Sequence, residues 1–326
     1  VSDHPELVKQ FQGEGPVLDD LEWDVKAYLA LGSAMHDCAI SAWGVKGWYD
    51  SSRPITAIRG MAELGQSSDP ALPSYHPGGL PLVPGAIELV EAGDPLAGVG
   101  GQHVGEVKLW AWKGSDAIGS VDNDYAGVGW ILAKAWEPYQ RPSFVSPNFA
   151  GYVSGHSTFS RAAAEVLTAF TGDAYFPGGM GTFLAPAGEF LVFEDGPSVD
   201  VELQWATYRD ASDECSLSRI YGGIHPTFDD VPGRLMGIDI GLDAFERAVS
   251  FYGGDTTEGP CNSTPEPATC PGDLDQDGFV AISDLLLLLG DFGCSDACVG
   301  DVDGDGMVTV ADLLGGILAA FGEACL

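Results

Sequence analysis

Apolar residues recur at steps of three and four along several stretches of the chain, which predicts amphipathic helices. The pattern is longest over residues 21–48, LEWDVKAYLALGSAMHDCAISAWGVKGW. A second helix is predicted from the Ser-Gly pair at 154–155 through an alanine-rich run that ends at Thr-Gly-Asp, residues 171–173. Residues 231–253 predict a third helix, whose glycines let a neighbouring helix pack closely. The pattern therefore favours a mostly helical structure over residues 1–252.

Pro- and Gly-rich connections separate these helices, for example SSDPALPSYHPGGLPLVPG at residues 67–85. Alternation of apolar and polar residues at a period of two is scarce. Its best candidate is EFLVFEDGPSVDVELQW, residues 189–205, which predicts a short hairpin or an extended loop. We therefore predict an all-α domain, a helical bundle, over residues 1–252.

The last part of the chain is organised differently. Residues 253–270 are rich in Gly, Pro, Thr and Glu without periodicity, which predicts a linker. After the linker, GDLDQDGFVAISDLLLLLGDFG and GDVDGDGMVTVADLLGGILAAFG form an internal repeat with a period of 28 residues. We therefore predict a small second domain over residues 271–326.

Each copy of the repeat has the spacing of a calcium-binding loop. Oxygens at loop positions 1, 3, 5 and 12, a glycine at position 6 and a backbone carbonyl at position 7 surround one hard cation. The alternative interpretation is a pair of acidic turns. Two such loop-helix units after a linker resemble a type I dockerin, which implies two bound Ca²⁺ and a cohesin-like docking partner. The predicted calcium ligands are Asp273, Asp275, Asp277, Phe279, Asp284, Asp301, Asp303, Asp305, Met307 and Asp312.

Charge and cysteine content restrict the function classes. The chain has 326 residues, and its formal net charge of −34 makes nucleic acid and anionic membranes poor partners. It has no run of 18 apolar residues, so we expect no membrane span. Five of the seven cysteines follow residue 260, which favours disulfides and a secreted, extracellular or cell-surface location. The chain begins at Val1 without a signal-like segment, so we expect it to be processed or truncated.

One short stretch combines residues suited to oxyanion chemistry. In SRIYGGIHPTFDD, residues 218–230, His225 and Asp229 lie four positions apart, so the carboxylate can orient the imidazole. Arg219 offers a planar donor fork that suits an oxyanion.

Two upstream segments supply partners of the same chemical kind. In VSGHS, Ser154, Gly155 and His156 stand at a predicted helix start, where a hydroxyl and a free backbone N–H favour an anion. In KGWYDSSRP, Lys46 and Arg53 lie seven positions apart and add two cations. Taken singly, each segment is more often structural than functional.

Together and in this order, the three segments match K-x6-R-P, SGH and SR-x3-G-x-H-x3-D. The sequence therefore resembles the superfamily of type 2 phosphatidic acid phosphatases and vanadium-dependent haloperoxidases, over roughly residues 20–250. The resemblance implies a helical bundle in which His225 binds vanadate or attacks phosphorus and His156 is the acid–base residue. It also implies that Lys46 polarises a bound oxygen and that Asp229 supports His225. The implied oxyanion ligands are Lys46, Arg53, Ser154, Gly155, Arg219 and His225.

The resemblance leaves two catalytic chemistries open, because one site serves vanadate and phosphoryl transfer alike. Trp43 and the stretch FAGYVSGH, which places Phe149 at the pocket wall, favour a haloperoxidase. Its substrates would be halide, hydrogen peroxide and a small organic acceptor. The alternative is a soluble acid phosphatase that works through a phosphohistidine at His225. A third hypothesis is a scaffold-bound binding protein whose pocket holds phosphate.

Two departures from the family pattern qualify the resemblance. Family members usually have Pro before SGH, where this chain has Val153. Haloperoxidases of the family carry a further helical bundle before this half, so we expect either a fragment or a shorter branch.

Since the motifs converge, Cys38 and Cys215 are candidates for a disulfide. Cys261–Cys270 and Cys294–Cys298 are the next candidate pairs, and other connectivities remain open.

Overall fold

The computed structural model describes residues 1–254 together with positions 274, 284, 287, 288, 291, 294, 301, 302 and 307–309. The chain divides into two compact units, Val1–Asp255 and Thr256–Leu326. The predicted linker and most of the predicted calcium domain lie outside the described residues.

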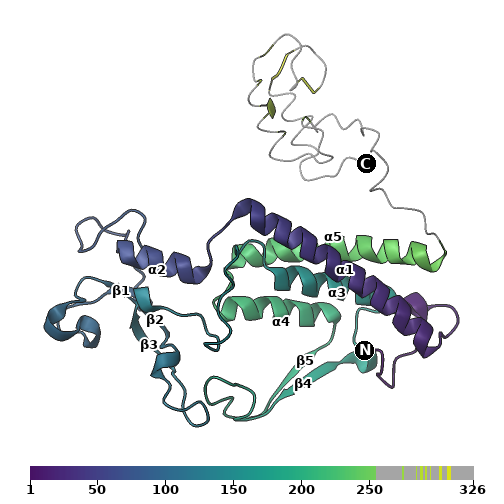
Figure 1. Cartoon of the computed structure of the whole chain (residues 1–326), viewed down its shortest axis with the longest axis horizontal. Coiled ribbons are helices and arrows are strands. Elements are labelled where there is room, and N and C mark those ends of the chain that lie inside the picture. Colours follow the sequence, from purple (N-terminus) through teal and green to yellow (C-terminus); the bar gives the residue numbers. More distant parts are fainter. Residues whose placement is uncertain are drawn as a thin grey trace. The chain divides into compact units, whose positions relative to one another are not determined.

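The described part of the first unit contains five α-helices (Figure 1). Helix α3 is central, because it packs against α1, α4 and α5. Six short 3₁₀ helices lie in the connections. The α-helices are α1 (Asp20–Tyr49), α2 (Pro54–Leu64), α3 (Gly155–Thr171), α4 (Tyr208–Tyr221) and α5 (Thr227–Tyr252).

The helix starts and ends follow local chemistry. The Asp19 carboxylate accepts from the Glu22 N–H at the start of α1, and Ser154 caps α3. Helix α4 begins with a reciprocal capping box between Thr207 and Asp210. Gly172, in the left-handed conformation, ends α3 where Thr-Gly-Asp predicts its end.

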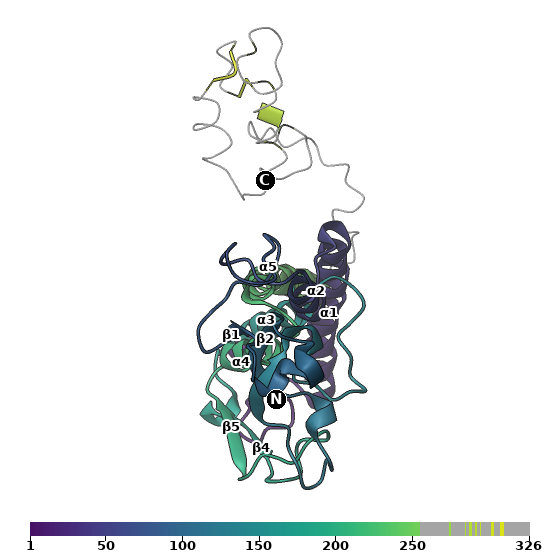
Figure 2. The same cartoon turned by 90° about the vertical axis from the view of Figure 1, so that its left-hand side faces the viewer.

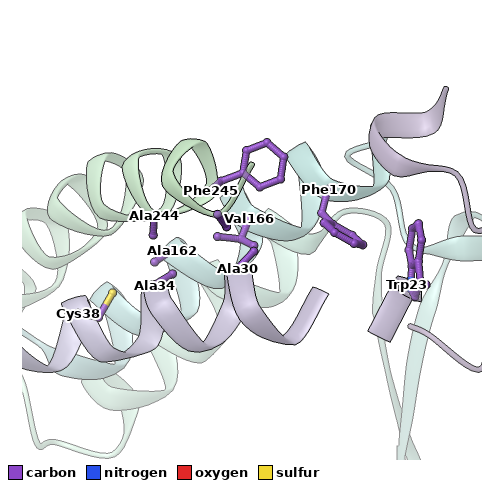
Figure 3. Packing of buried hydrophobic residues seen from close by; sticks show 10 residues of the cluster. Trp23, Ala30, Ala34, Cys38, Ala162, Val166, Phe170, Ala244 and Phe245 are labelled. Carbon is purple, nitrogen blue, oxygen red and sulfur yellow. The ribbon is translucent and has the colours of Figure 1, made fainter. Parts of the chain in front are cut away.

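The core of the bundle contains small side chains at the helix crossings (Figure 3). Ala30, Ala34 and Cys38 follow one another at four-residue steps on α1 and are fully buried. A face of such small residues lets α1 approach α3 and α5 closely. Trp23, Val166, Phe170 and Phe245 fill the space around this crossing.

Helix α5 approaches α3 even more closely, through glycines at four-residue steps. A Cβ atom added at Gly233 would lie 2.8 Å from the Ser154 carbonyl oxygen, and one at Gly241 would lie 2.7 Å from that of Ala162. Only a residue without a Cβ fits such an approach. The prediction that the glycines of this helix allow close packing is therefore confirmed.

The all-α prediction is wrong for the connections, because two antiparallel sheets occur in the described residues. The strands of the first, beside α2, are β1 (Ile87–Leu89), β2 (Val107–Trp112) and β3 (Val128–Leu132), paired in that order. Figure 2 views the first unit from the end that carries this sheet. Its central strand, VKLWAW, has no clear period of two, since Val107, Lys108 and Leu109 are all buried. The alternation rule therefore missed it.

The second sheet corrects the predicted hairpin. Strand β5 (Val201–Trp205) lies inside the expected stretch 189–205, but it pairs with β4 (Gly181–Ala185), which lies before it. The segment between the two strands, residues 186–200, is a long loop of turns and bends rather than a tight hairpin turn. No helix in the part of the chain that the structure describes is long and apolar enough to cross a bilayer.

Candidate functional site

Helix termini bring the predicted site residues to one end of the bundle. Lys46 stands in the last turn of α1, and Arg219 stands in the last turn of α4. His156 and Asp229 stand in the first turns of α3 and α5. The N-terminal ends of α3 and α5 therefore contribute their positive dipole ends to the same region.

Two tight connections place the remaining residues. Asp50, in the left-handed conformation, ends α1, and Arg53 then serves as the N-cap residue before Pro54. Gly223, with φ +71°, lies in the connection from α4 to His225. A Cβ atom there would meet the Trp136 ring at 2.9 Å, so this turn requires glycine.

Hydrogen bonds fix the tautomer of His225. Its Nδ1 lies 2.6 Å from Asp229 Oδ2, and its Nε2 lies 2.9 Å from an Nη1 of Arg53. Because arginine only donates, Nε2 is the acceptor and the proton is on Nδ1. Burial is the main cause that lowers the pKa of His225, and Arg53 lowers it further, which favours the neutral ring. Its Nε2 lone pair therefore faces the cations of the site.

Three cations gather here without a carboxylate in ion-pair contact with any of them. Lys46 is 3% exposed and Arg53 is 6% exposed, and Arg219 is half-buried. In residues 1–254, these three side chains make no ion pair within 4.0 Å, whereas Arg161, Arg209 and Arg234 all do. Asp229, engaged by His225, is the nearby carboxylate. The site therefore has an excess of buried positive charge.

Backbone carbonyls hold two of these cations. Lys46 Nζ donates to the carbonyls of Gly151 at 2.6 Å and Ala150 at 3.0 Å. Arg53 donates from Nε to the Phe149 carbonyl at 3.0 Å. Burial and the neighbouring Arg53 lower the pKa of Lys46 to about 8. Lysine is therefore still mostly charged at neutral pH, although its charged state is destabilised.

Aromatic rings form one wall of the site. The Trp43 and Phe149 ring centroids lie 5.2 Å apart. Lys46 Nζ lies 5.9 Å from the Trp43 ring and 5.6 Å from the Phe149 ring, and the Arg53 guanidinium lies 5.3 Å from Phe149. The Trp43 ring also contacts the position at which a Gly155 Cβ would stand, at 3.4 Å. The indole therefore lies within van der Waals distance of this helix start.

His156 lies at the solvent side of this group. Its side chain reaches solvent, yet partial burial lowers its pKa to about 4, together with the charges of Arg219, His225 and other cations. The ring is therefore neutral at pH 7 and has a lone pair with which to accept a proton.

Ser154 is engaged inside the protein through two residues that the sequence motifs did not single out. Its Oγ lies 2.9 Å from Ser157 Oγ, which in turn lies 2.7 Å from Asp230 Oδ1. Because the carboxylate only accepts, Ser157 donates to Asp230 and Ser154 donates to Ser157. Ser157 and Asp230 stand directly after His156 and Asp229, and this adjacency was the only sequence signal for them.

The residues present fit an oxyanion. The buried Nε of Arg219 has no hydrogen-bond partner among the described residues. As the first residue of α3, Gly155 has an N–H without a carbonyl partner inside the helix. Donors that lack acceptors, beside excess positive charge, are the requirements for binding the oxygens of a tetrahedral or trigonal anion.

The predicted disulfide between Cys38 and Cys215 is wrong, because both residues are free thiols. Cys38 is fully buried in the core, where burial raises its pKa to about 12, and its Sγ approaches the Thr158 carbonyl at 3.8 Å. Cys215 is half-buried on α4. Convergence of the two motifs therefore did not bring these two sulfur atoms together.

Most predicted calcium ligands, and the remaining cysteine pairs, lie outside the described residues. Asp284 is fully buried, and its Oδ1 accepts from the Leu274 N–H at 2.6 Å. Cys294 is disulfide-bonded. The described residues contain no cluster of three His, Cys, Asp or Glu side chains suited to a metal ion.

Comparison with solved structures identifies similar folds. An apo bacterial vanadium-dependent chloroperoxidase superposes with a TM-score of 0.53 at 21% identity, over 74% of this chain and 40% of that protein. The holo form of a bacterial vanadium-dependent chloroperoxidase gives a TM-score of 0.47 at 21% identity, over 70% of this chain and 35% of that one. The chain thus spans less than half the length of these proteins. No curated protein sequence matches it.

The sequence itself matches a family profile over most of its length. The profile describes the VCPO second helical-bundle domain and covers residues 26–254, which include every helix of the bundle described above except the first turns of α1. This chain therefore belongs to the family of the VCPO second helical-bundle domain, within the vanadium haloperoxidase superfamily.

Proposed function

We propose that this chain is a vanadate-dependent haloperoxidase that oxidises halide with hydrogen peroxide, giving hypohalous acid or a halogenated organic acceptor. The observation that carries the proposal is the neutral His225, whose Nε2 lone pair faces Arg53 among cations without carboxylate partners. A lone pair held in this way suits coordination of vanadate, and the surrounding donors suit its oxygens.

Each residue of the site has a role in this proposal. Lys46, Arg53 and Arg219 bind and neutralise the oxygens, together with the Gly155 N–H. Bound vanadate supplies Lewis-acid activation of peroxide without a redox change at the metal. His156, neutral at pH 7, takes a proton from the incoming peroxide and later returns one. Asp229 keeps the proton on Nδ1 of His225.

The aromatic wall favours this reaction over phosphate ester hydrolysis. Trp43 and Phe149 place aromatic rings beside Lys46 and Arg53, which makes one side of the site apolar. The alternative, an acid phosphatase, rests on the same lone pair, because a neutral histidine fixed by a carboxylate is also a nucleophile.

The test is bromination of an activated diketone by the full chain with bromide, hydrogen peroxide and vanadate. We expect turnover that requires vanadate, and calorimetric vanadate binding that is lost in His225→Ala but retained in His36→Ala, an exposed histidine on α1. Hydrolysis of an aryl phosphate without peroxide would favour the phosphatase instead. Vanadate binding that survives in His225→Ala would refute the assignment of the site.

The second unit is proposed to be a dockerin-like module, residues 271–326, that binds two Ca²⁺ and docks to a cohesin-like partner. The repeat spacing supports this proposal, and so does the buried carboxylate of Asp284 at loop position 12. The disulfide at Cys294 supports a secreted or cell-surface location. Calcium titration of the full chain should give two sites, reduced to one by Asp273→Asn. No calcium binding at millimolar concentration would contradict the module.

A further inference from the structure

A groove adjoins the oxyanion site and takes no part in the roles described so far. Its volume is about 410 Å³, and it lies between α1, α3 and α4. This volume is within the range of sites for small organic ligands. Trp43 and Met35 line it from α1, Phe159 and Ala163 from α3, and Cys215 from α4.

The lining selects for a neutral and aromatic ligand. No Asp, Glu, Lys or Arg side chain lines the groove. Trp43 and Phe159 meet edge to face, with ring centroids 6.3 Å apart, and Trp43 is 45% exposed. Ring faces stack on aromatic ligands, and the sulfur atoms of Met35 and Cys215 add polarizable contacts. A charged ligand would lose hydration without gaining an ion pair.

Three residues, Trp43, Gly155 and His156, belong to both the groove and the oxyanion site. His156 lines the groove and lies in the field of Arg219, His225 and Arg53. Trp43 lines the groove and also stands over Lys46. A ligand in the groove is therefore a neighbour of the acid–base residue, on the side of the site that reaches solvent.

We propose that this groove binds a neutral aromatic acceptor, which is halogenated there instead of by hypohalous acid released into solution. The halogenation of the bound acceptor rests on the proposed haloperoxidase function. In the overall step the halide loses two electrons to the O–O bond of the peroxide. An aryl C–H bond breaks, a C–halogen bond forms, and the two peroxide oxygens leave as two water molecules after uptake of one proton from solvent and of the proton released by the ring.

The binding half is tested without vanadate, halide or peroxide. The full chain is titrated calorimetrically with 2-naphthol and with its saturated analogue of the same size, decahydro-2-naphthol. We expect the aromatic compound to bind at least tenfold more tightly. Ala163→Trp fills the groove and should weaken naphthol binding at least tenfold, whereas Ala187→Trp, on an exposed loop, should not. Ala163→Leu provides a smaller obstruction if the tryptophan variant does not fold.

The delivery half is tested with vanadate-loaded protein, bromide and peroxide. The ratio of brominated naphthol isomers should differ from the ratio given by free hypobromous acid, and Ala163→Trp should shift it to the free value without changing vanadate affinity. The proposal is overturned if naphthol does not bind below millimolar concentration. This result is expected if a protein segment covers the groove. Binding that Ala163→Trp and Ala163→Leu leave unchanged also overturns the proposal. Naphthol binding without bromination would retain the site and reject halogenation, which separates the two proposals.

Discussion

The Ser154–Ser157–Asp230 chain makes an unusual prediction, because removing one of its hydroxyl groups should improve anion binding. In the structure the Ser154 proton is directed to Ser157 Oγ, at 2.9 Å, and Ser157 donates to Asp230 at 2.7 Å. Both serines are fully buried, so water does not compete for these bonds. Ser157→Ala removes the acceptor of the Ser154 proton. The Ser154 hydroxyl can then donate its proton to an oxyanion bound at the start of α3.

The magnitude follows from the two hydrogen bonds that change. A hydrogen bond to a charged acceptor contributes roughly 1.5–3 kcal/mol, which corresponds to a roughly tenfold to hundredfold lower Kd for the anion. The same substitution leaves Asp230 with its ion pair to Arg234, at 2.8 Å, but without the serine donor. We therefore expect the free energy of unfolding to fall by about 1–3 kcal/mol while anion affinity rises.

Calorimetric titration with inorganic phosphate and with vanadate measures the effect, and chemical denaturation measures the stability. Thr168→Ala, a hydroxyl deletion three turns further along α3, is the matched control and should leave the Kd unchanged. An unchanged or weaker Kd in Ser157→Ala would refute the reasoning, because it would mean that the Ser154 hydroxyl does not reach the anion. A role confined to folding would change stability without tightening binding.

Three further predictions follow from the site and the core. Since the pKa of Lys46 is about 8, the charge is present below that pH and lost above it, so phosphate affinity should fall above about pH 8 in the native protein and not in Lys46→Gln. Binding of phosphate should raise the pKa of His156 above its value of about 4, seen by NMR titration of the ring, since a nearby anion stabilises the protonated form; an unchanged pKa would place the anion elsewhere. Gly241→Ala should lower the free energy of unfolding by about 1–3 kcal/mol, because its Cβ would lie 2.7 Å from a carbonyl oxygen. Gly32→Ala, where the same atom meets nothing within 4 Å, should raise it by up to about 1 kcal/mol.

The helices were predictable because their chemistry is local. The residues that begin and end α3, Ser154 and Gly172, are visible in the sequence as a cap and a stop. The strands were not, because β1 to β3 depend on pairing between segments about 20 residues apart rather than on their own pattern. Val107 and Leu109 are buried together with Lys108 between them, which hides the period of two.

Some residues of the site were predictable from the sequence and others were not. Lys46, Arg53 and His225 were predicted because three short motifs, in this order, resemble the signature of the superfamily. The role of Asp230 was not found, since it depends on how closely α5 crosses α3. That distance is set by Gly233, which lets the backbone of α5 approach the Ser154 carbonyl. Pairing of Cys38 with Cys215 failed for a related reason, because convergence of two helices does not determine which side chains face each other.

The overall charge of the protein explains why the oxyanion site needs to be buried. With 48 acidic residues against 14 basic ones, an exposed cation readily meets a carboxylate, as Arg161 and Arg209 do at Glu165. Lys46 and Arg53 form no such ion pair, because they are enclosed by helix ends and backbone carbonyls. An approaching anion is repelled by the acidic surface over about one Debye length, roughly 10 Å at 0.1 M salt. The cations of the site therefore act at short range. They retain their affinity for an anion because the fold keeps surface carboxylates out of ion-pair contact with them and engages the nearby Asp229 with His225.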